Sequence, residues 1–313
     1  MPAADLLLAV DVSNLIVRHH SSPYGSDYDL AGRPIFGVCG AVRQIASLVA
    51  RERPTHLLLA RDGQRSQSFR RQISASYKAH RADADEDLTR QFTLAYQAFD
   101  TLGWPSLAAD SYEADDILAS AAAAFDGRTV IVSGDKDLLA LCDQTTTVCL
   151  LRNGGHVERC DAAGCERIMN VTPDQVRDFK ALAGDSSDGI PGVAGVGPKS
   201  AVELLGRYGS LAGIFRRLDA GEPLLGVRPH IARKVAEGRE EARVSWRLAG
   251  LVGTLPVDCE ALRLPASGLP QPSDHAEALR DLGLGPLLKD NAKGVDVSGL
   301  TGTQALSKLF EVL

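Results

Sequence analysis

Nine acidic residues stand in short groups along the chain, at spacings that suit a site for metal ions. They are Asp11, Asp62, Glu113, Asp115, Asp116, Asp135, Asp137, Asp185 and Asp188. Carboxylates held about 4 Å apart repel each other by roughly 4 kcal/mol at intermediate dielectric, so a cluster of them is tolerated where cations bind. Ligands that are all oxygen favour Mg²⁺ or Mn²⁺. More acids than one ion needs favour two ions, an arrangement that cleaves phosphate esters.

Each of these acids also has a simpler interpretation when it is taken alone. Aspartates that follow strands are common turn formers. Glu113, Asp115 and Asp116 fit the first turn of a helix, where the helix dipole favours acids. Convergence of the whole group on one place is what favours a metal site, so the elements that position the acids decide the question.

A basic segment without any acid follows Asp62. Residues 64–81 read QRSQSFRRQISASYKAHR, and Phe69 and Tyr77 are interleaved with its cations. This composition favours gripping phosphates and stacking bases, although a solvated basic helix is the alternative. On a helix, Lys78 and Arg81 would lie on neighbouring faces and point towards one phosphate. The further residues expected to contact nucleic acid here are Arg70, Arg71 and Tyr77.

A glycine-rich turn, GDSSDGIPGVAGVGPKS at residues 184–200, precedes a predicted helix. Pro198 displaces the lysine of a Walker A loop, and a dinucleotide fingerprint would need a glycine at Ser200. A tight turn between helices can instead present its backbone to nucleic acid or to a bound cation. An ordinary helix-to-helix turn is the alternative. The residues expected to form the contact are Gly192, Gly195, Gly197 and Lys199.

The scaffold for these residues can be predicted from the apolar runs. Short runs at residues 6–12, 55–60, 129–134 and 146–151 predict buried strands, and helical patterns lie between them, including 37–52, 88–102 and 113–125. Alternating strands and helices predict an α/β domain with a largely parallel sheet. Ligand sites of such sheets lie outside the carboxyl ends of the strands. Asp11, Asp62, Asp135 and Asp137 follow three of these strands, so we expect them to meet at one edge.

A helical region follows the α/β domain after about residue 165. Its predicted helices span residues 172–184, 197–209 and 228–248. Thr172 is a good N-cap for the first of them, and Pro173 suits its first helical position. Asp185 and Asp188 follow this helix and would add two acids to the set from a different part of the chain.

Composition limits the class of protein. The chain has 313 residues, 44% of them hydrophobic, and no apolar run long enough for a membrane span. Its six cysteines show no paired spacing, which predicts reduced thiols and a cytoplasmic protein. The formal net charge is −6, but without the nine acids it would be +3, so the total does not exclude a polyanionic partner.

The motifs as a set resemble the bacterial 5′ nuclease family. They are VDVSN, ARDG, FRRQISASYKAHR, YEADDILAS, VSGDKDLLAL and GDSSDGIPGVAGVGPKSA, and the similarity runs from about residue 6 to about residue 290. This family includes the 5′–3′ exonuclease and flap endonuclease domain at the N-terminus of DNA polymerase I. No polymerase follows here, so the chain resembles a free-standing 5′ nuclease.

The resemblance implies a fold and its divisions. Residues 1–170 would form a PIN-like α/β nuclease core with a helical arch at 64–90. Residues 171–265 would form a helical region with a helix-three-turn-helix DNA-binding motif, and residues 266–313 a C-terminal helical segment packed on the core. The partner would be DNA with a 5′ flap, a nick, a gap or a free 5′ end, and the protein would be a monomer associated with the nucleoid.

The resemblance also implies roles for the candidate residues. Asp11, Asp62, Glu113 and Asp115 would hold one metal ion. Asp135, Asp137, Asp185 and Asp188 would hold a second, with Asp116 in a supporting position. Lys78 and Arg81 would grip the scissile phosphate. The glycine turn would bind duplex DNA with a potassium ion, for which the carbonyl groups of Val193 and Val196 are the expected ligands.

Two departures and two rival functions remain. Arg61 stands where the family usually has an apolar or aromatic residue, and Gly189 stands where asparagine is common. A ribonuclease of the wider PIN class needs only about four acids and no glycine turn, so the larger acidic set speaks against it. A DNA-binding protein that has lost catalysis would lack some of the acids, and none is missing here.

Overall fold

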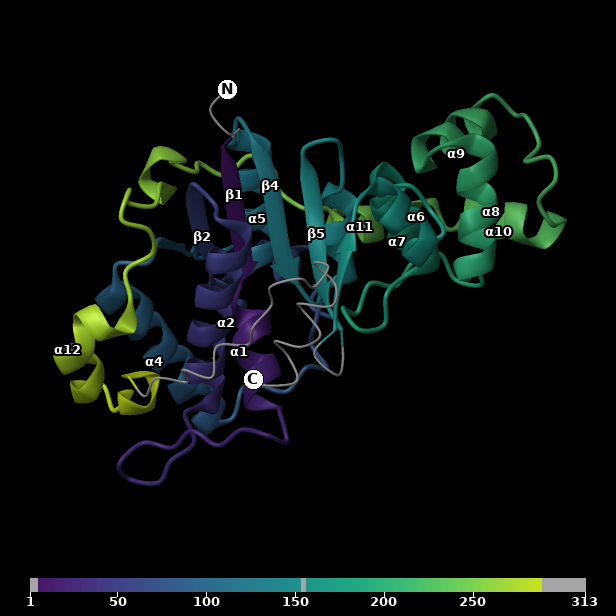
Figure 1. The fold of residues 1–313 in the computed structure, drawn as a ribbon. Helices are drawn as coiled ribbons and strands as arrows, with labels where there is room; N and C mark the ends of the chain where they lie inside the picture. Colours follow the sequence, from purple (N-terminus) through teal and green to yellow (C-terminus); the bar gives the residue numbers. More distant parts are fainter. Residues whose placement is uncertain (1–4, 153–155, 289–313) are drawn as a thin grey trace.

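A mostly parallel sheet forms the centre of the computed structural model, which describes residues 5–152 and 156–288 (Figure 1). Within these residues the sheet has six strands in the order β3-β2-β1-β4-β5-β6. All neighbours are parallel except β5 and β6, which confirms the predicted largely parallel sheet. The strands are β1 (Leu6–Asp11), β2 (His56–Ala60), β3 (Ser106–Leu107), β4 (Arg128–Ser133), β5 (Thr146–Leu151) and β6 (Val157–Cys160).

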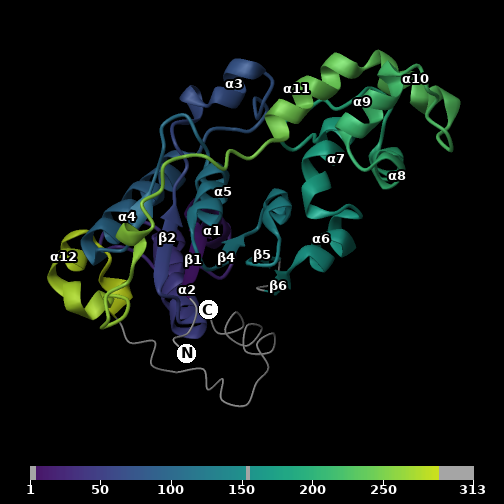
Figure 2. The ribbon, with the colours of Figure 1, turned by 90° about the horizontal axis from the view of Figure 1, so that it is seen from above.

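Helices cover both faces of the sheet because successive strand residues point to opposite sides. Leu8 and Val10 of β1 pack against α1 (Val12–His20), α2 (Phe36–Glu52) and α4 (Glu86–Leu102). Leu7 and Ala9 pack on the other face, against α5 (Ala114–Ala124). Figure 2 shows α2 and α5 on opposite sides of the strands. The strands are therefore buried on both faces, as their continuous apolar runs predict.

A helical region extends from the β5–β6 side of the sheet, where Figure 1 shows α8, α9 and α10. The sequence predicts a single helix over 228–248, but the structure breaks it at Gly238. A Cβ at Gly238 would meet Cγ1 of Val193 at 2.6 Å, so the break lets the backbone approach the glycine turn. The helices of this region are α6 (Ala162–Met169), α7 (Val176–Ala183), α8 (Pro198–Tyr208), α9 (Leu211–Asp219), α10 (Pro229–Glu237) and α11 (Arg239–Ala249).

The basic segment is not one continuous helix, so the condition under which Lys78 and Arg81 would lie on neighbouring helix faces is not met. It contains the short elements η1 (Arg65–Gln67) and α3 (Phe69–Ile73), turns follow over residues 75–80, and irregular chain leads to the start of α4. Lys78 has a φ of 50°, in the left-handed region that a right-handed helix does not use. Its backbone N–H donates to the carbonyl of Asp188 at 2.8 Å. This contact with a distant loop replaces a helical hydrogen bond, so Lys78 and Arg81 do not share a helix in this structure.

The C-terminal part of the described chain returns to the sheet. Its elements are η5 (Glu260–Leu262), η6 (Pro272–His275), α12 (Ala276–Asp281) and η7 (Gly285–Leu288). Leu279, Leu284 and Leu287 join the core on the α2–α4 face. The rest of the predicted C-terminal segment, residues 289–313, lies outside the described residues.

Two further expectations can be compared with the structure. All six cysteines are free, as their unpaired spacing predicts. None of the helices in the described ranges combines the length and the apolar character that a membrane span requires.

Candidate metal centre and nucleic-acid interface

Four aspartates lie at the carboxyl edge of the sheet, and we call them the strand-edge set: Asp11, Asp62, Asp115 and Asp135. Asp11 ends β1, while Asp62 and Asp135 each follow a strand, β2 and β4 respectively, by two residues. These three strands are parallel neighbours, so their ends converge as predicted. Asp115 comes from the first turn of α5.

Hydrogen bonds tie the ends of β1 and β4 together. Asp11 is the N-cap of α1 and accepts from the backbone N–H of Asn14 at 3.0 Å. The hydroxyl of Ser133 donates to Asp11 at 2.7 Å and accepts from the N–H of Asp135 at 3.1 Å. The side-chain oxygen of Asn14 accepts from the N–H of Gly134 at 2.9 Å. Sequence reasoning did not single out Asn14, three residues after Asp11, or Ser133, two residues before Asp135, although both lie within quoted motifs.

Helix starts orient the other members of the set. Asp62 accepts from the N–H of Ala114, the first residue of α5, at 2.8 Å. Asp135 accepts from the N–H of Asp137 at 2.8 Å, at the start of η2 (Lys136–Leu141). Backbone N–H groups at helix N-termini stabilise negative charge. The carboxylates are thus held in place by the main chain.

The strand-edge carboxylates repel one another. Asp11 is only 6% exposed. Burial, and then the charge of Asp62, raises the pKa of Asp11 to about 7. Burial, followed by the charges of Asp135 and Asp11, raises the pKa of Asp115 well above its ordinary value. Since a bound cation relieves such repulsion, these shifts favour a cation-binding site.

Three further acids, which we call the junction set, lie where the sheet meets the helical region. Asp137 is in η2, while Asp185 and Asp188 are in the loop after α7. One carboxylate oxygen from each lies within 4.8 Å of the others, and no other trio of acidic, histidine or cysteine ligands in the described residues is as compact. Divalent cations bond to oxygen at about 2.0–2.6 Å, so this trio fits a hard cation such as Mg²⁺ or Mn²⁺.

Basic side chains are bonded to the junction set. Lys180 of α7 is 6% exposed, and its Nζ bonds both to Asp137 and to Oδ2 of Asp185, the latter at 2.6 Å. Arg81 Nη2 donates to Oδ1 of Asp188 at 2.5 Å. Sequence reasoning missed Lys180 because it occupies an ordinary position in an amphipathic helix, and only the fold brings it to these acids.

The pKa values of this set reflect the lysine. Burial opposes the charge of Lys180, but Asp137 and Asp185 outweigh it and raise the pKa of the ammonium. Burial likewise opposes the charge of Asp185, but Lys180 and Ser187 lower the pKa of that carboxyl to about 2. Asp137 differs, because burial and the charge of Asp135 raise its pKa to about 7 despite the ammonium.

Two predicted site residues have structural roles instead. Asp116 is fully buried, and its carboxylate accepts from Arg70 Nη1 and Nη2, both at 2.7 Å, and from the N–H of Val252 and of Glu113. These four bonds leave no oxygen for a metal ion. Arg70 is 2% exposed and also donates to the carbonyls of Leu248 and Gly250. Asp116 therefore occupies a supporting position beside Glu113 rather than that of a metal ligand, and the burial of Arg70 contradicts its expected contact with DNA.

Tyr77 is also placed differently from the prediction. It is 3% exposed, and its hydroxyl donates to Oε2 of Glu113 at 3.0 Å, so its ring is not available for base stacking. The same oxygen accepts from Lys78 Nζ at 2.8 Å. Glu113 thus faces the basic segment, with Lys78 beside the strand-edge set. Arg71 is half-buried on the neighbouring α3.

The glycine turn is partly buried and partly exposed. Gly192 is buried, and its N–H donates to Ser245 Oγ at 2.9 Å, so the expectation that it meets DNA is wrong. Gly195, Gly197 and Lys199 are exposed. The N–H of Val196 donates to the carbonyl of Val193, and Gly195 between them has a φ of 84°, which is the third position of a type II turn. The side chains of both valines are buried.

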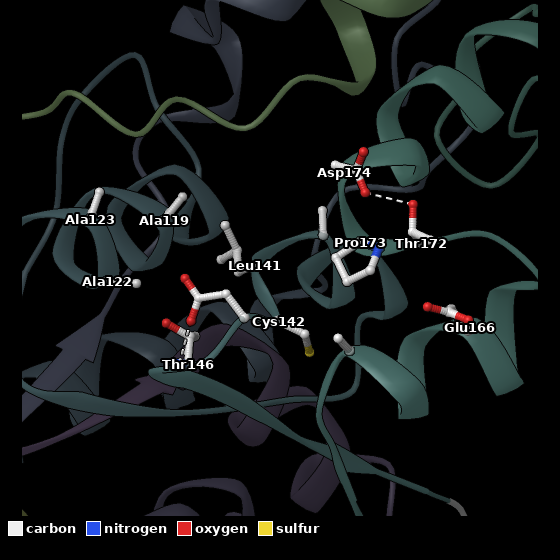
Figure 3. Close-up of a pocket in the computed structure, with 13 residues that line it drawn as sticks. Ala119, Ala122, Ala123, Leu141, Cys142, Thr146, Glu166, Thr172, Pro173 and Asp174 are labelled. Carbon is white, nitrogen blue, oxygen red and sulfur yellow. Dashed lines mark hydrogen bonds between the residues drawn. The ribbon is translucent and has the colours of Figure 1, made fainter. Parts of the chain in front are cut away.

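A cavity of about 560 Å³ lies elsewhere (Figure 3). Alanines of α5, together with Cys142, Glu166 and Asp174, are among the residues that line it. Thr146, another lining residue, begins β5, so the cavity is at the amino end of that strand rather than at the carboxyl edge. The 13 residues that line it include no predicted site residue.

Comparison with protein families gives two consecutive matches. Residues 6–171 match the 5′–3′ exonuclease N-terminal resolvase-like domain, and residues 171–271 match the 5′–3′ exonuclease C-terminal SAM fold. The flap endonuclease Xni of Shewanella amazonensis is 36% identical and covers 80% of this chain and 94% of its own length. The thermostable DNA polymerase I of Thermus filiformis is 35% identical over 80% of this chain. This chain spans only 30% of that polymerase.

Solved structures share the fold. The T5 D15 protein co-crystallised with metal ions gives a TM-score of 0.65 at 21% identity, over 89% of this chain and 99% of that chain. The catalytic core of Rad2 in complex with DNA substrate gives a TM-score of 0.54 at 16% identity, over 90% of this chain and 92% of that chain.

Proposed function

Because the chain belongs to the 5′–3′ exonuclease family, we propose that it is a metal-dependent, structure-specific 5′ nuclease that hydrolyses phosphodiester bonds in DNA. Its substrates are 5′ flaps, nicked or gapped duplexes and 5′ ends, in DNA replication or repair. The proposal includes the predicted monomeric state and cytoplasmic, nucleoid-associated location.

The observation that carries the proposal is the meeting of the two acidic sets. The strand-edge set comes from parallel strand ends and α5, while the junction set adds two acids from the helical region. Asp135 links the sets, because its charge raises the pKa of Asp11, Asp115 and Asp137 alike. A continuous row of carboxylates along one edge fits two cations better than one.

The two acidic sets are proposed to hold two divalent ions, and the compact trio Asp137, Asp185 and Asp188 supports the second of them. Asp11, Asp62, Glu113 and Asp115 would hold the first, and Asp135, Asp137, Asp185 and Asp188 the second. When bound, such ions polarise a phosphate ester and lower the pKa of a bound water. The main-chain bonds to Asp11, Asp62 and Asp135 keep the strand-edge oxygens oriented before any ion arrives. Preorganised ligands of this kind need little rearrangement during the reaction.

The basic segment supplies cations at the same edge. Lys78 and Arg81 contact Glu113 and Asp188 respectively, so each already lies beside an acid of the site. Once metal ions neutralise these acids, the two side chains can turn to a phosphate and stabilise the charge that develops on it. Lys78 is 14% exposed and Arg81 44% exposed at the side chain, so a strand of DNA would reach Arg81 first.

The exposed part of the glycine turn is proposed to hold duplex DNA. Gly195 and Gly197 bring bare backbone to the surface, and Lys199 follows in the first turn of α8. The N-terminus of a helix favours phosphate. A potassium ion on the carbonyls of Val193 and Val196 would add a positive charge here. Arg71 is proposed as a more remote phosphate contact.

The decisive experiment compares substrates and metals in one assay. We expect cleavage of a 5′-flap DNA with Mg²⁺ or Mn²⁺, none in EDTA, and slower cleavage of single-stranded DNA. An RNA strand cut faster than the matched DNA would instead favour the ribonuclease. Flap binding without cleavage in every metal would favour an inactive DNA-binding protein.

A control variant removes an acid that lies away from the proposed site. Glu166→Gln removes an exposed acid beside the cavity at the amino end of β5 and should leave the rate unchanged. The DNA contact is checked separately with Lys199→Ala. This variant should weaken flap binding in Ca²⁺ and reduce the salt dependence by about one unit of slope. An unchanged affinity would exclude the turn as the duplex-binding surface.

A further inference from the structure

Lys180 occupies the place in the junction set where a cation would bind. Its Nζ bonds to Asp137 and, at 2.6 Å, to Asp185, and these are two of the three acids whose oxygens lie within 4.8 Å of one another. A divalent ion shared by both carboxylates needs oxygens at about 2.0–2.6 Å on the same side that the ammonium occupies. The ammonium and the ion therefore cannot both bridge this pair of acids.

We propose that Lys180 is a built-in competitor of the second metal ion, which must displace the lysine from Asp137 and Asp185 in order to bind. This inference rests on the proposed function, because it assumes that the junction set binds a metal. It assigns Lys180 a positioning role. Without metal, the ammonium offsets the repulsion between two close carboxylates; when the ion binds, the ammonium moves away from them. The affinity of the second site is consequently lower than the same carboxylates would have without the lysine.

The setting of Lys180 makes the exchange physically reasonable. The side chain is 7% exposed, so its ammonium depends on these two carboxylates rather than on water for its stabilisation. A lysine carries its charge on a flexible four-carbon stem, so it can move away while α7 stays in place. The strand-edge set is different, because backbone N–H groups and the Ser133 hydroxyl hold its carboxylates. Competition by Lys180 is thus confined to the second ion.

The test is a Mn²⁺ titration of the whole protein without DNA. Binding is measured by calorimetry and by the electron spin resonance signal of free Mn²⁺. The wild type should show a tighter and a weaker class of site. Lys180→Met keeps the length and apolar stem but removes the charge. It should tighten the weaker class at least about tenfold, equivalent to about 1.4 kcal/mol, and leave the tighter class unchanged.

Two control variants separate competition at this site from a general effect of charge. Lys136→Met removes an exposed lysine that stands between Asp135 and Asp137 in sequence, and it should titrate like the wild type. Lys180→Arg retains the charge and should keep the weaker class weak. If Lys180→Met does not fold in EDTA, the same comparison is made with Lys180→Gln, whose amide retains hydrogen bonding without charge.

The thermal midpoint gives a second readout. Lys180→Met should melt below the wild type in EDTA, because two neighbouring acids lose their counter-ion, and the difference should close as Mn²⁺ is added. A lysine with only a structural role would lower the midpoint equally at every Mn²⁺ concentration.

The outcomes separate this inference from the proposed function. A weaker class of equal or lower affinity in folded Lys180→Met would overturn the competition, even if the enzyme cuts DNA. Two classes of Mn²⁺ site that respond as expected, in a protein that cleaves no nucleic acid, would instead overturn the proposed nuclease and leave the competition standing.

Discussion

The two acidic sets are built in opposite ways. The strand-edge set is held by the main chain, through helix starts that follow the strands at once, and its members raise one another's pKa. The junction set joins the α/β domain to the helical region and is held by the charges of Lys180 and Arg81. The first set has carboxylates oriented by the main chain and a largely unbalanced charge, while the second brings three carboxylate oxygens within 4.8 Å of one another and has much of its charge balanced by basic side chains. The comparison teaches that two neighbouring acidic sets can differ in how they are held, so the ions proposed to bind them need not bind with equal strength.

The largest test of this difference removes one acid from each set. Asp115→Asn should lower the single-turnover rate on a 5′-flap substrate by about 1,000-fold or more, because a prepared ligand is lost. Asp185→Asn should lower it by about 100-fold, and higher Mn²⁺ should restore part of the rate. Binding of the flap in Ca²⁺ should be retained by both variants. The contrast between the sets would be contradicted if both variants lost the same rate and higher Mn²⁺ restored neither or both equally.

A second test compares the two cations of the basic segment. Lys78→Met removes the less exposed cation, which contacts Glu113, and should lower the single-turnover rate at saturating enzyme by about 100-fold. Arg81→Met removes the more exposed cation, which contacts Asp188, and should lower the single-turnover rate by about tenfold. The measurement is an enzyme titration of flap cleavage, which separates rate from affinity. A larger loss for Arg81→Met would place the reacting phosphate nearer to the junction set.

The third and smallest effect concerns stability and pH. The raised pKa values of Asp11 and Asp137, both about 7, mean that the folded protein holds protons that the unfolded chain releases. The free energy of unfolding in EDTA should therefore fall as pH rises from 5 to 8, lowering the thermal midpoint by about 5 °C. Asp185, with its pKa lowered to about 2, acts in the opposite sense and only below about pH 4.

Variants and metal sharpen this pH test. Mg²⁺ should raise the thermal midpoint more at pH 8 than at pH 6, since it relieves repulsion between ionised acids. Asp115→Asn should flatten the decline between pH 5 and pH 8, whereas Asp185→Asn should leave its slope in place. An EDTA midpoint that rises over this range would show that the strand-edge acids are stabilised in some other way.

Sequence reasoning succeeded where the pattern is local. Apolar runs located β1, β2, β4 and β5, and the acids that follow three of them could be placed at one edge from parallel topology alone. The two-residue β3 and the antiparallel β6 were missed, because neither has a continuous apolar run. The helix α1 was missed because it begins directly at the end of β1, with no turn residues between them.

Reasoning failed where partners are distant in sequence. Arg70 belongs to a run of cations that suits phosphate binding, and nothing near it indicates that Asp116 will bury it. The left-handed turn at Lys78 depends on a carbonyl of Asp188, more than a hundred residues away. Gly189 completes this contact, since a Cβ there would meet the carbonyl of Ser76 at 2.4 Å. An asparagine at this position would push the basic segment away from the junction set.

The buried pair of Arg70 and Asp116 has a mechanical consequence. Asp116 belongs to α5, Arg70 to α3, and their further bonds run to Leu248, Gly250 and Val252, where the chain leaves α11. This buried pair thus joins three parts of the molecule: α3 of the basic segment, α5, and the chain that follows α11. Under the proposed function, this connection would fix the spacing between two parts of the DNA-binding surface. It would hold the proposed duplex-binding turn at a fixed distance from the carboxylates, and the position of the cut would then be set by its distance from the end of the duplex.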